Sequence, residues 1–329
     1  MFSATGLPRG NVEAMTSRIG TWNLENLFRP GVDGPSSKGD YDQKLKTLAA
    51  TINDLEPDVL CVQEVGDPDA LADLVKLLSG TWHSALADPD GRGIRAGIIS
   101  RTELSSVDQI AAFPDKVQPV QVEDDGATIQ EMGRPALRAQ VKLAGTTVTV
   151  ISAHLKSKLL SFPGGRFNPK DEGERARYGF YALTRRAGEA AALRAGADIS
   201  LDGDGGRHAV VVAGDLNDEI QAATTQILLG PGGSEIGTKG HQIPDKGDAT
   251  RLWNVGPLIP EKERYSRIYQ GRGELIDHIL ISKALVDKVK SASAGSEKLG
   301  TTPSITDNPN ARKDKPGSDH RPVVADFEL

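Results

Sequence analysis

The sequence predicts an α/β fold, and three observations support this class. Short apolar runs such as 59–62 and 209–212 have the composition of buried strands. Other segments, such as 41–55, place apolar residues at helical spacing. The chain has 329 residues, of which 38% are hydrophobic, with 36 glycines and 19 prolines, and this suits one large globular domain with long loops.

The first half of the chain alternates between the two patterns. Leu45, Leu48 and Ile52 fall on one face of the helix expected at 41–55. Gly145-Thr146 is a predicted hairpin turn before a run rich in valine and threonine. We predict strands at 18–22, 57–64, 94–100, 105–111, 117–122, 134–143 and 147–152, and helices at 41–55 and 69–78.

The second half of the chain contains longer loops. Residues 230–246 are rich in glycine and proline, and residues 291–316 contain few apolar side chains, so both segments are predicted to be loops. We predict strands at 209–212, 274–281 and 323–327, and helices at 172–197 and 219–229.

Composition restricts the location of the protein. No run approaches the roughly 18 apolar residues that cross a bilayer. The N-terminus also lacks the apolar core of a secretion signal, so a cytoplasmic location is expected. We expect a disordered tail at 1–16, a single domain at 17–329 and a monomer, and no protein partner follows from the sequence.

Cysteine content and net charge restrict the chemistry further. Cys61 is the only cysteine, which excludes an intramolecular disulfide and a cysteine metal cage, and its apolar neighbours predict a buried thiol. The net charge of −6 argues against binding nucleic acid over the whole surface, although a local basic patch is compatible with it.

Polar groups lie at or near the ends of several predicted strands. These groups are Asn23, Glu25, Glu64, His154, Asp215, Asn217, Asp319 and His320, with Asp277 and His278 inside a further strand. Asp215 and Asn217, two residues apart on a strand end, are expected to point the same way because side chains alternate. The alternative is that the pair only shapes a turn or caps the next helix. Carboxylates that end hydrophobic strands need water, a partner or a cation, so the combination indicates a site.

The ligand types favour a hard cation. Carboxylates and amides with few histidines suit Mg²⁺, with Mn²⁺ as a substitute, far better than Zn²⁺. Magnesium keeps several waters and takes only one or two protein carboxylates, which leaves positions for substrate oxygens. The sequence therefore indicates chemistry on a phosphate group.

Six motifs carry a resemblance that spans nearly the whole chain. They are WNLEN, DVLCVQEV, ISAH, GDLND, LIDHILIS and SDHRPV, in this order between residues 22 and 323. In this order they resemble the endonuclease/exonuclease/phosphatase superfamily of metal-dependent phosphoesterases, and bacterial nuclease-like members in particular. The resemblance implies two packed, mainly antiparallel sheets flanked by helices in four layers, with a site at one end of the sandwich.

The resemblance also implies a role for each site residue. Glu64 is implied as the principal metal carboxylate, with Asn23 beside it and Asp319 as the second carboxylate. Asp215 is implied to align the attacking water and help to deprotonate it, and Asn217 and His154 to hold phosphate oxygens. Asp277 is implied to orient His320, which acts as an acid, a base or a charged donor.

Glu25 departs from the pattern of many relatives, so its contact with the metal is left open. His278 is expected to point away from the site and to pack.

Two substrate classes remain open for this chemistry. The leading hypothesis is a nuclease that acts on DNA, supported by a stretch from 156 to 186 with eight basic and three acidic residues. Lys156, Lys158, Arg175 and Arg177 are its candidate substrate ligands, although a solvated helix of mixed charge explains the stretch equally well.

The alternative is a phosphatase or phosphodiesterase for a small or lipid-linked phosphate, such as an inositol phosphate or sphingomyelin. The acidic net charge and the apolar residues 159–162, expected in an exposed loop, support this alternative. An inactive binding module is a third hypothesis, and it is disfavoured because each site position is retained.

Overall fold

The structure is a computed structural model that describes residues 16–306, 308 and 311–329. The tail predicted at 1–16 lies outside these residues except for Thr16, which begins the first strand. None of the helices described is both long enough and apolar enough to cross a membrane.

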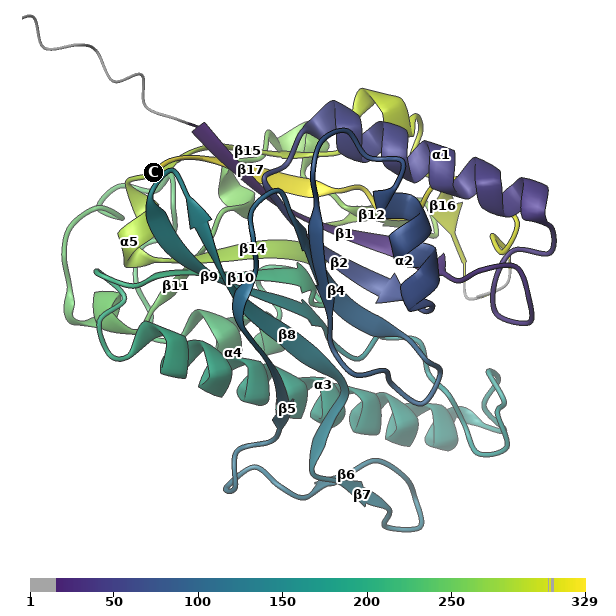
Figure 1. Cartoon of the computed structure of the whole chain (residues 1–329). Coiled ribbons are helices and arrows are strands. Elements are labelled where there is room, and N and C mark those ends of the chain that lie inside the picture. The colour runs from purple at the N-terminus through teal and green to yellow at the C-terminus, as the bar shows by residue number, and fades with distance from the viewer. Residues whose placement is uncertain (1–15, 307, 309–310) are drawn as a thin grey trace, which may run out of the picture.

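Two six-stranded sheets form the centre of the molecule (Figure 1). The first sheet contains, in spatial order, β15 (Val289–Ala294), β17 (Val323–Glu328), β1 (Thr16–Leu27), β2 (Val59–Val65), β4 (Arg95–Ser100) and β3 (His83–Leu86). The second contains β11 (Leu252–Asn254), β14 (Asp277–Ser282), β10 (Ala209–Asp215), β9 (Thr146–His154), β8 (Glu131–Leu143) and β5 (Ser105–Ala112). Neighbouring strands are antiparallel except for the pairs β1–β2 and β9–β10.

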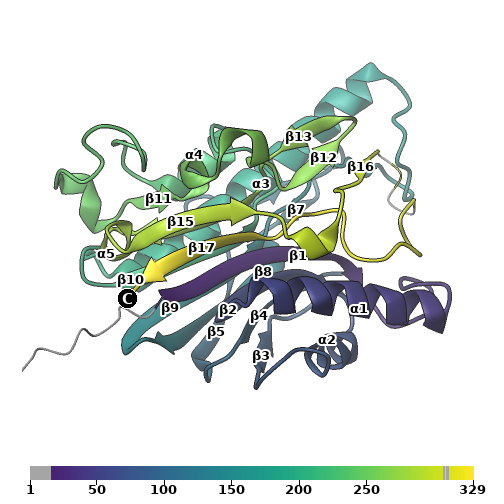
Figure 2. The ribbon, with the colours of Figure 1, turned by 90° about the horizontal axis from the view of Figure 1, so that it is seen from above.

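Apolar side chains fill three layers around these sheets. Ile19, Val150 and Val211 belong to the core between the two sheets. Helices α1 (Lys38–Leu55) and α2 (Pro68–Val75) cover the outer face of the first sheet, whereas α3 (Glu172–Leu201) and α4 (Ala223–Leu229) cover that of the second (Figure 2). The predicted fold class, a mainly antiparallel sandwich between helices, is confirmed.

The smaller elements connect these layers. They are the helix α5 (Lys283–Val286) and the strands β6 (Val120–Gln121), β7 (Thr128–Ile129), β12 (Arg267–Tyr269), β13 (Arg272–Glu274) and β16 (Ser304–Ile305). Short 3-10 helices occupy Lys246–Ala249, Gly256–Leu258, Glu261–Glu263 and Glu297–Leu299.

The loop predicted at 291–316 is wrong at 304–305, where the short strand β16 pairs with β12, and at its start. Strand β15 occupies this position and pairs with β17. Ala292 and Ala294 face inward while Ser291 and Ser293 face solvent, so the alternation typical of a strand is present but is carried by small side chains. Small residues give a weak hydrophobic signal, and the pairing with β17 makes the strand.

Other boundaries also differ from the predictions. The hairpin turn is Ala144-Gly145 rather than Gly145-Thr146; both turn residues have positive φ, and Leu143 pairs with Thr146. Of the strand predicted at 117–122 only β6 forms, and the helix predicted at 219–229 begins at Ala223. The strand predicted at 274–281 begins at Asp277, because Glu274 ends the separate strand β13.

Strand register brings the ends of distant segments together. Asp215, the last residue of β10, pairs with His154 of β9 on one side and with Asp277 of β14 on the other. In the first sheet Asn23 of β1 pairs with Gln63 of β2, next to Glu64. Backbone pairing thus gathers His154, Asp215 and Asp277 in the second sheet, and the packing of the two sheets brings Asn23 to them.

Candidate active site

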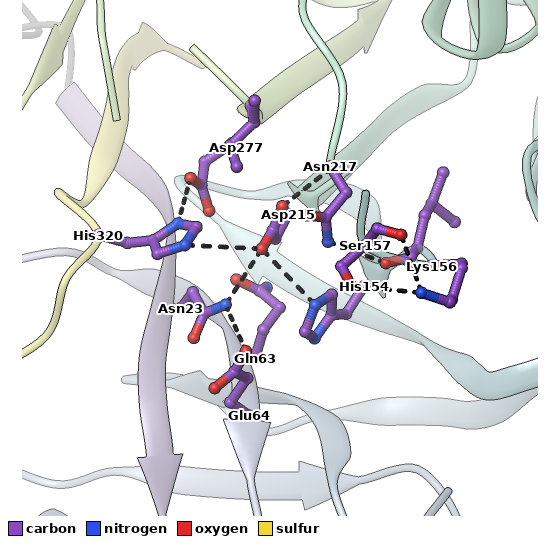
Figure 3. Close-up of polar contacts among 12 residues, drawn as sticks. Asn23, Gln63, Glu64, His154, Lys156, Ser157, Asp215, Asn217, Asp277 and His320 are labelled. Atoms are coloured by element: carbon purple, nitrogen blue, oxygen red, sulfur yellow. Dashed lines mark hydrogen bonds and ion pairs between the residues drawn. The ribbon is translucent and has the colours of Figure 1, made fainter. Parts of the chain in front are cut away.

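Asp215 lies at the centre of a buried polar cluster (Figure 3). Its Oδ2 atom is 3.1 Å from Asn23 Nδ2, 3.6 Å from His154 Nε2 and 3.9 Å from His320 Nε2. Asn23, His154, Asp215, Asp277 and His320 are each at most 4% exposed. Strands β1 and β9 and the segment before β17 therefore direct polar groups to this carboxylate of β10. Asp277 of β14 contacts His320 beside it.

His320 is oriented by the residues on either side of its ring. Its Nδ1 lies 2.7 Å from Asp277 Oδ2, which fixes the ring so that Nε2 faces Asp215. Its backbone is also held, because the indole of Trp22 donates to the His320 carbonyl and the His320 amide donates to Ser318 Oγ.

Asn23 links the two sheets at this end of the sandwich. Its Nδ2 donates to Glu64 Oε1 and to Asp215 Oδ2, both at 3.1 Å. The second oxygen of Glu64 accepts from the amide of Asn26 at 2.8 Å. Glu64 has a φ of 59°, a backbone conformation uncommon for a residue with a side chain and frequent at functional sites.

The prediction that Asp215 and Asn217 point the same way along one strand is wrong, because β10 ends at Asp215. Asn217 has a φ of 54°, and its amide donates to Asp215 Oδ1 at 2.9 Å, so the two residues form a turn. The Asn217 side chain is buried beside the cluster and donates to the carbonyl of Leu155 at 2.9 Å. The turn, rather than strand alternation, brings Asn217 to the cluster.

Burial and mutual charge shift the pKa values of this cluster. Burial, and then the charge of Asp277, raises the pKa of Asp215 to about 6. Burial alone would lower the pKa of His320, but Asp277 and Asp215 outweigh it and raise the pKa to about 10. His320 therefore carries a proton at neutral pH, whereas Asp215 is mostly ionised.

His154 differs from His320 in charge. Burial, with the positive charges of Arg134 and His320, lowers the pKa of His154 well below its usual value, so the ring is neutral. Its Nδ1 atom is buried and has no hydrogen-bond partner in the described part of the chain. A buried polar atom without a partner is costly, and a ligand oxygen would satisfy it.

The acidic groups beside the cluster fit a hard cation. Asp319 is half-buried, and within the described residues its carboxylate makes no hydrogen bond or ion pair. Burial, and then the charge of Asp319, raises the pKa of Glu25 to about 7, so these two carboxylates lie near each other. Glu25 itself is paired with Arg312 at 2.8 and 3.1 Å. Glu64 and Asp319 with Asn23 thus offer oxygen ligands of the kind that Mg²⁺ prefers, whereas Glu25 is already engaged.

A second group of potential ligands lies within the cluster itself. Asp215, Asp277 and His320 each place one ligand atom within 4.8 Å of the others. The strong hydrogen bond between Asp277 and His320, together with the proton on His320, favours a role in proton handling over metal binding for this group.

The four cations predicted to bind substrate are engaged by the protein. Lys156 Nζ donates to the carbonyls of Ser157 and Leu159, and Lys158 pairs with Asp218 at 3.1 Å. Arg175 and Arg177, near the start of α3, are about half exposed and pair with carboxylates, Glu172 and Asp124 respectively. The charge of Lys156 acts on His154, whereas Arg175 and Arg177 make no hydrogen bond or ion pair with the cluster within the described residues.

Two further expectations concern residues outside the cluster. His278 packs as expected: its ring bonds Asn254 and the carbonyl of Asp218 on the other face of β14. The loop 159–162 is not an exposed apolar loop at its end, because Phe162 is 4% exposed and its ring packs against Tyr178 at 5.2 Å. Cys61 is fully buried, as predicted.

Arg134 is a site residue that sequence reasoning missed. Its guanidinium donates to the carbonyls of His154 and Leu155 at 3.3 and 3.1 Å, which fixes the end of β9. No local pattern marks this role, because the carbonyls belong to residues 20 and 21 positions along the chain. Its place at the start of a predicted strand was the only available signal.

Comparisons with known proteins agree with this architecture. Solved structures with the same fold include truncated TDP2 from Caenorhabditis elegans, at 17% identity and a TM-score of 0.55 over 96% of this chain and 99% of that one. The 3′ phosphatase NExo from Neisseria, bound to product DNA hairpin, aligns at 18% identity and a TM-score of 0.55 over 95% and 100%. The mannosyl-6-phosphatase Bt3783 from Bacteroides thetaiotaomicron aligns at 16% identity and a TM-score of 0.56 over 94% and 98%.

Sequence comparison identifies the family. No curated protein sequence matches the chain significantly. The model of the endonuclease/exonuclease/phosphatase family, whose members are phosphoesterases that generally depend on a divalent metal, matches residues 20–320. The chain therefore belongs to the endonuclease/exonuclease/phosphatase family.

Proposed function

We propose that this protein hydrolyses phosphodiester bonds by attack of an activated water and that its substrate is DNA. The observation that carries the proposal is the convergence of Asn23, His154 and His320 on the buried carboxylate of Asp215. Attack on an anionic ester needs an oriented water, donors for the phosphate oxygens and stabilisation of the leaving oxygen. The cluster contains groups suited to each task.

The pKa values divide the proton-transfer roles between Asp215 and His320. His320 holds its proton at neutral pH and cannot accept another, so it acts as the charged donor to the phosphate or to the leaving oxygen. Asp215 has a pKa of about 6 and is mostly ionised at pH 7, so it orients the water and accepts its proton. Asp277 holds the ring of His320 in place.

Phosphate binding falls to neutral donors. Asn217 and the neutral ring of His154 are the proposed contacts to the phosphate group. Glu64, Asp319 and Asn23 are the proposed ligands of Mg²⁺ or Mn²⁺, and the bound ion would neutralise phosphate charge as a Lewis acid. Glu25 is the weakest candidate ligand because it is paired with Arg312.

DNA is favoured over other phosphate esters by a further observation. Several basic side chains surround a cavity beside the cluster, although the net charge of the chain is −6. The Neisseria enzyme with the same fold is a 3′ phosphatase bound to a DNA hairpin, which supports this choice by analogy. The mannosyl-6-phosphatase with the same fold supports the alternative, a small phosphate ester.

The experiment compares substrates under one set of conditions. Purified protein with Mg²⁺ or Mn²⁺ is incubated with supercoiled plasmid, a single-stranded oligonucleotide, RNA, inositol phosphates, sphingomyelin and bis(4-nitrophenyl) phosphate. We expect cleavage of DNA that stops with EDTA and falls in Asp215→Asn. If the protein left polynucleotides uncleaved and rapidly hydrolysed an inositol phosphate, the proposal of a DNA substrate would be wrong. The alternative substrate class, a small or lipid-linked phosphate, would then take its place.

A further inference from the structure

A basic cavity of about 560 Å³ opens beside the Asp215 cluster. Its volume lies in the range of sites that hold a small molecule or one unit of a polymer. Three acidic residues, Glu25, Asp33 and Asp90, also line the cavity. Its basic residues are Arg92, Arg134, Lys156, Arg185, Arg312 and Lys313. The wall therefore has an excess of positive charge in a protein with a negative net charge.

The cavity adjoins the residues proposed for catalysis. Asn26, which lines it, donates its amide to Glu64, the proposed metal ligand. Arg134, another lining residue, donates to the carbonyl of His154. The charges of Arg134, Lys156 and Arg92 also help to lower the pKa of His154, after the larger effect of burial. Asn26 and Arg134 thus place the cavity next to the proposed metal ligand and the end of β9, on the side where a bound strand would continue.

Buried Glu189 organises one wall of the cavity. It is 2% exposed, and its Oε1 atom accepts from Arg185 Nε at 3.1 Å and from the Gly133 amide at 3.2 Å. Its Oε2 atom accepts from the Lys156 amide at 2.5 Å. One carboxylate on α3 thus fixes a side chain, strand β8 and the loop after β9 around the same cavity.

Arg185 is held at the wall with hydrogen-bond donors to spare. A Cβ on Gly133 would overlap its Nη2 atom, so the glycine allows the guanidinium to lie against the backbone. In the described residues, Glu189 bonds only the Nε of Arg185, and neither terminal nitrogen makes a hydrogen bond. Arg92 is similarly open, with one hydrogen bond of 3.4 Å to Asn26 Oδ1. The two guanidiniums can therefore bind phosphate oxygens.

An aromatic ring completes the cavity. Phe167 lines it and is 53% exposed, so part of its ring is accessible to a ligand in the cavity. Phosphate-binding arginines next to an open aromatic ring are the two features that bind successive units of a single nucleic-acid strand.

We propose that this cavity is a subsite for a nucleotide next to the scissile phosphate of a single-stranded segment. Arg185 and Arg92 bind its phosphate, and the unpaired base stacks on Phe167. This inference rests on the proposed function, since it places the reacting phosphate at Asp215. It adds that the strand is unpaired next to the cleavage point and that affinity depends on Arg185.

Binding can be measured separately from catalysis in the Asp215→Asn background. Fluorescence anisotropy with a labelled single-stranded oligonucleotide compares this protein with and without Arg185→Gln. We expect Arg185→Gln to weaken binding about tenfold and to reduce the slope of log K against log salt by about 0.7, the value for one lost phosphate contact on a single strand. The matched control is Arg207→Gln. The Arg207 side chain is 83% exposed and precedes the first residue of β10, at the end of the strand away from Asp215. This substitution should change affinity less than twofold.

Turnover then separates this inference from the proposed function. In the otherwise unchanged protein, Arg185→Gln should raise KM about tenfold for the oligonucleotide, with kcat within twofold, and leave hydrolysis of bis(4-nitrophenyl) phosphate unchanged. Phe167→Ala should raise KM several-fold for the single strand only. The subsite would be overturned if Arg185→Gln reduced turnover of both substrates equally or left the affinity for the oligonucleotide unchanged. It would also be overturned if Phe167→Ala affected only duplex DNA. Hydrolysis of neither substrate by the unmodified protein would overturn the proposed function instead, while the anisotropy measurement would still decide the subsite.

Discussion

The Asp215 cluster and the basic cavity hold their charges in opposite ways. In the cluster each charge faces an opposite charge or a donor, and every member is buried. In the cavity Arg185 and Arg92 keep donors free toward the open space. A buried, compensated network maintains fixed distances, which a reaction needs, whereas open donors gain their bonds only when an anion arrives. We therefore expect changes in the cluster to reduce kcat and changes in the cavity to raise KM.

The largest effect is expected from His320→Ala. It removes the charged donor and leaves Asp277 without its partner, so kcat should fall by about 10²–10⁴-fold on every substrate. Stability should also fall by about 1–3 kcal/mol, because a buried carboxylate loses its hydrogen bond. Turnover of the oligonucleotide and of bis(4-nitrophenyl) phosphate, with thermal unfolding, measures both effects.

A matched histidine controls for this result. His208 precedes the first residue of β10, at the end of the strand away from Asp215, and its imidazole bonds the carbonyl of Leu201. His208→Ala removes this ring, and kcat should stay within twofold. If His320→Ala lost activity on the polynucleotide alone, it would be wrong that the Asp215 cluster sets kcat and the basic cavity sets KM.

Asp277→Asn should produce an intermediate effect with a distinct pH signature. Asp277 and Asp215 outweigh burial and raise the pKa of His320 to about 10, and removing one of these charges lowers that pKa. A protonated donor is lost as pH rises through its pKa, so the alkaline fall in kcat should move to lower pH. At pH 7 kcat should fall about 10–100-fold. An unchanged alkaline limb would show that His320 does not act as the charged donor.

Gly133→Ala tests the cavity wall with little cost to the fold. The new Cβ would overlap the end of the flexible Arg185 side chain, so the guanidinium should move while the backbone stays in place. We expect KM for the oligonucleotide to rise about three- to tenfold, with kcat and the melting temperature nearly unchanged. A fall in kcat of equal size for the small ester would show that Gly133 supports the cluster rather than the cavity.

The smallest effects should come from Arg175→Ala and Arg177→Ala, which define where the cavity ends. Both side chains are about half exposed and paired with Glu172 and Asp124, away from the cavity wall. Exposed ion pairs contribute little, so kcat/KM for DNA should change less than twofold and the melting temperature should stay nearly unchanged. A tenfold rise in KM would restore the start of α3 as a substrate contact.

Much of the fold was predictable because its signals are local. Apolar runs and helical spacing located β2, β10, α1 and α3, and the order of six motifs indicated the sandwich. Strand β15 was missed because Ala292 and Ala294 are too small to give a hydrophobic pattern. Its existence depends on pairing with β17, a contact that no local window contains.

The sequence by itself determined which residue types end each strand, and therefore that Glu64, Asp215 and His320 are candidates for one chemistry. Only the tertiary structure decided their distances, the turn that holds Asn217, and the difference between Arg175 and Arg185 on one helix. The physical reason is that pKa values and free donors depend on neighbours from distant segments. Glu189 meets Gly133 and Lys156 only after β8, β9 and α3 have packed, so the cavity that they form is a property of the packed chain.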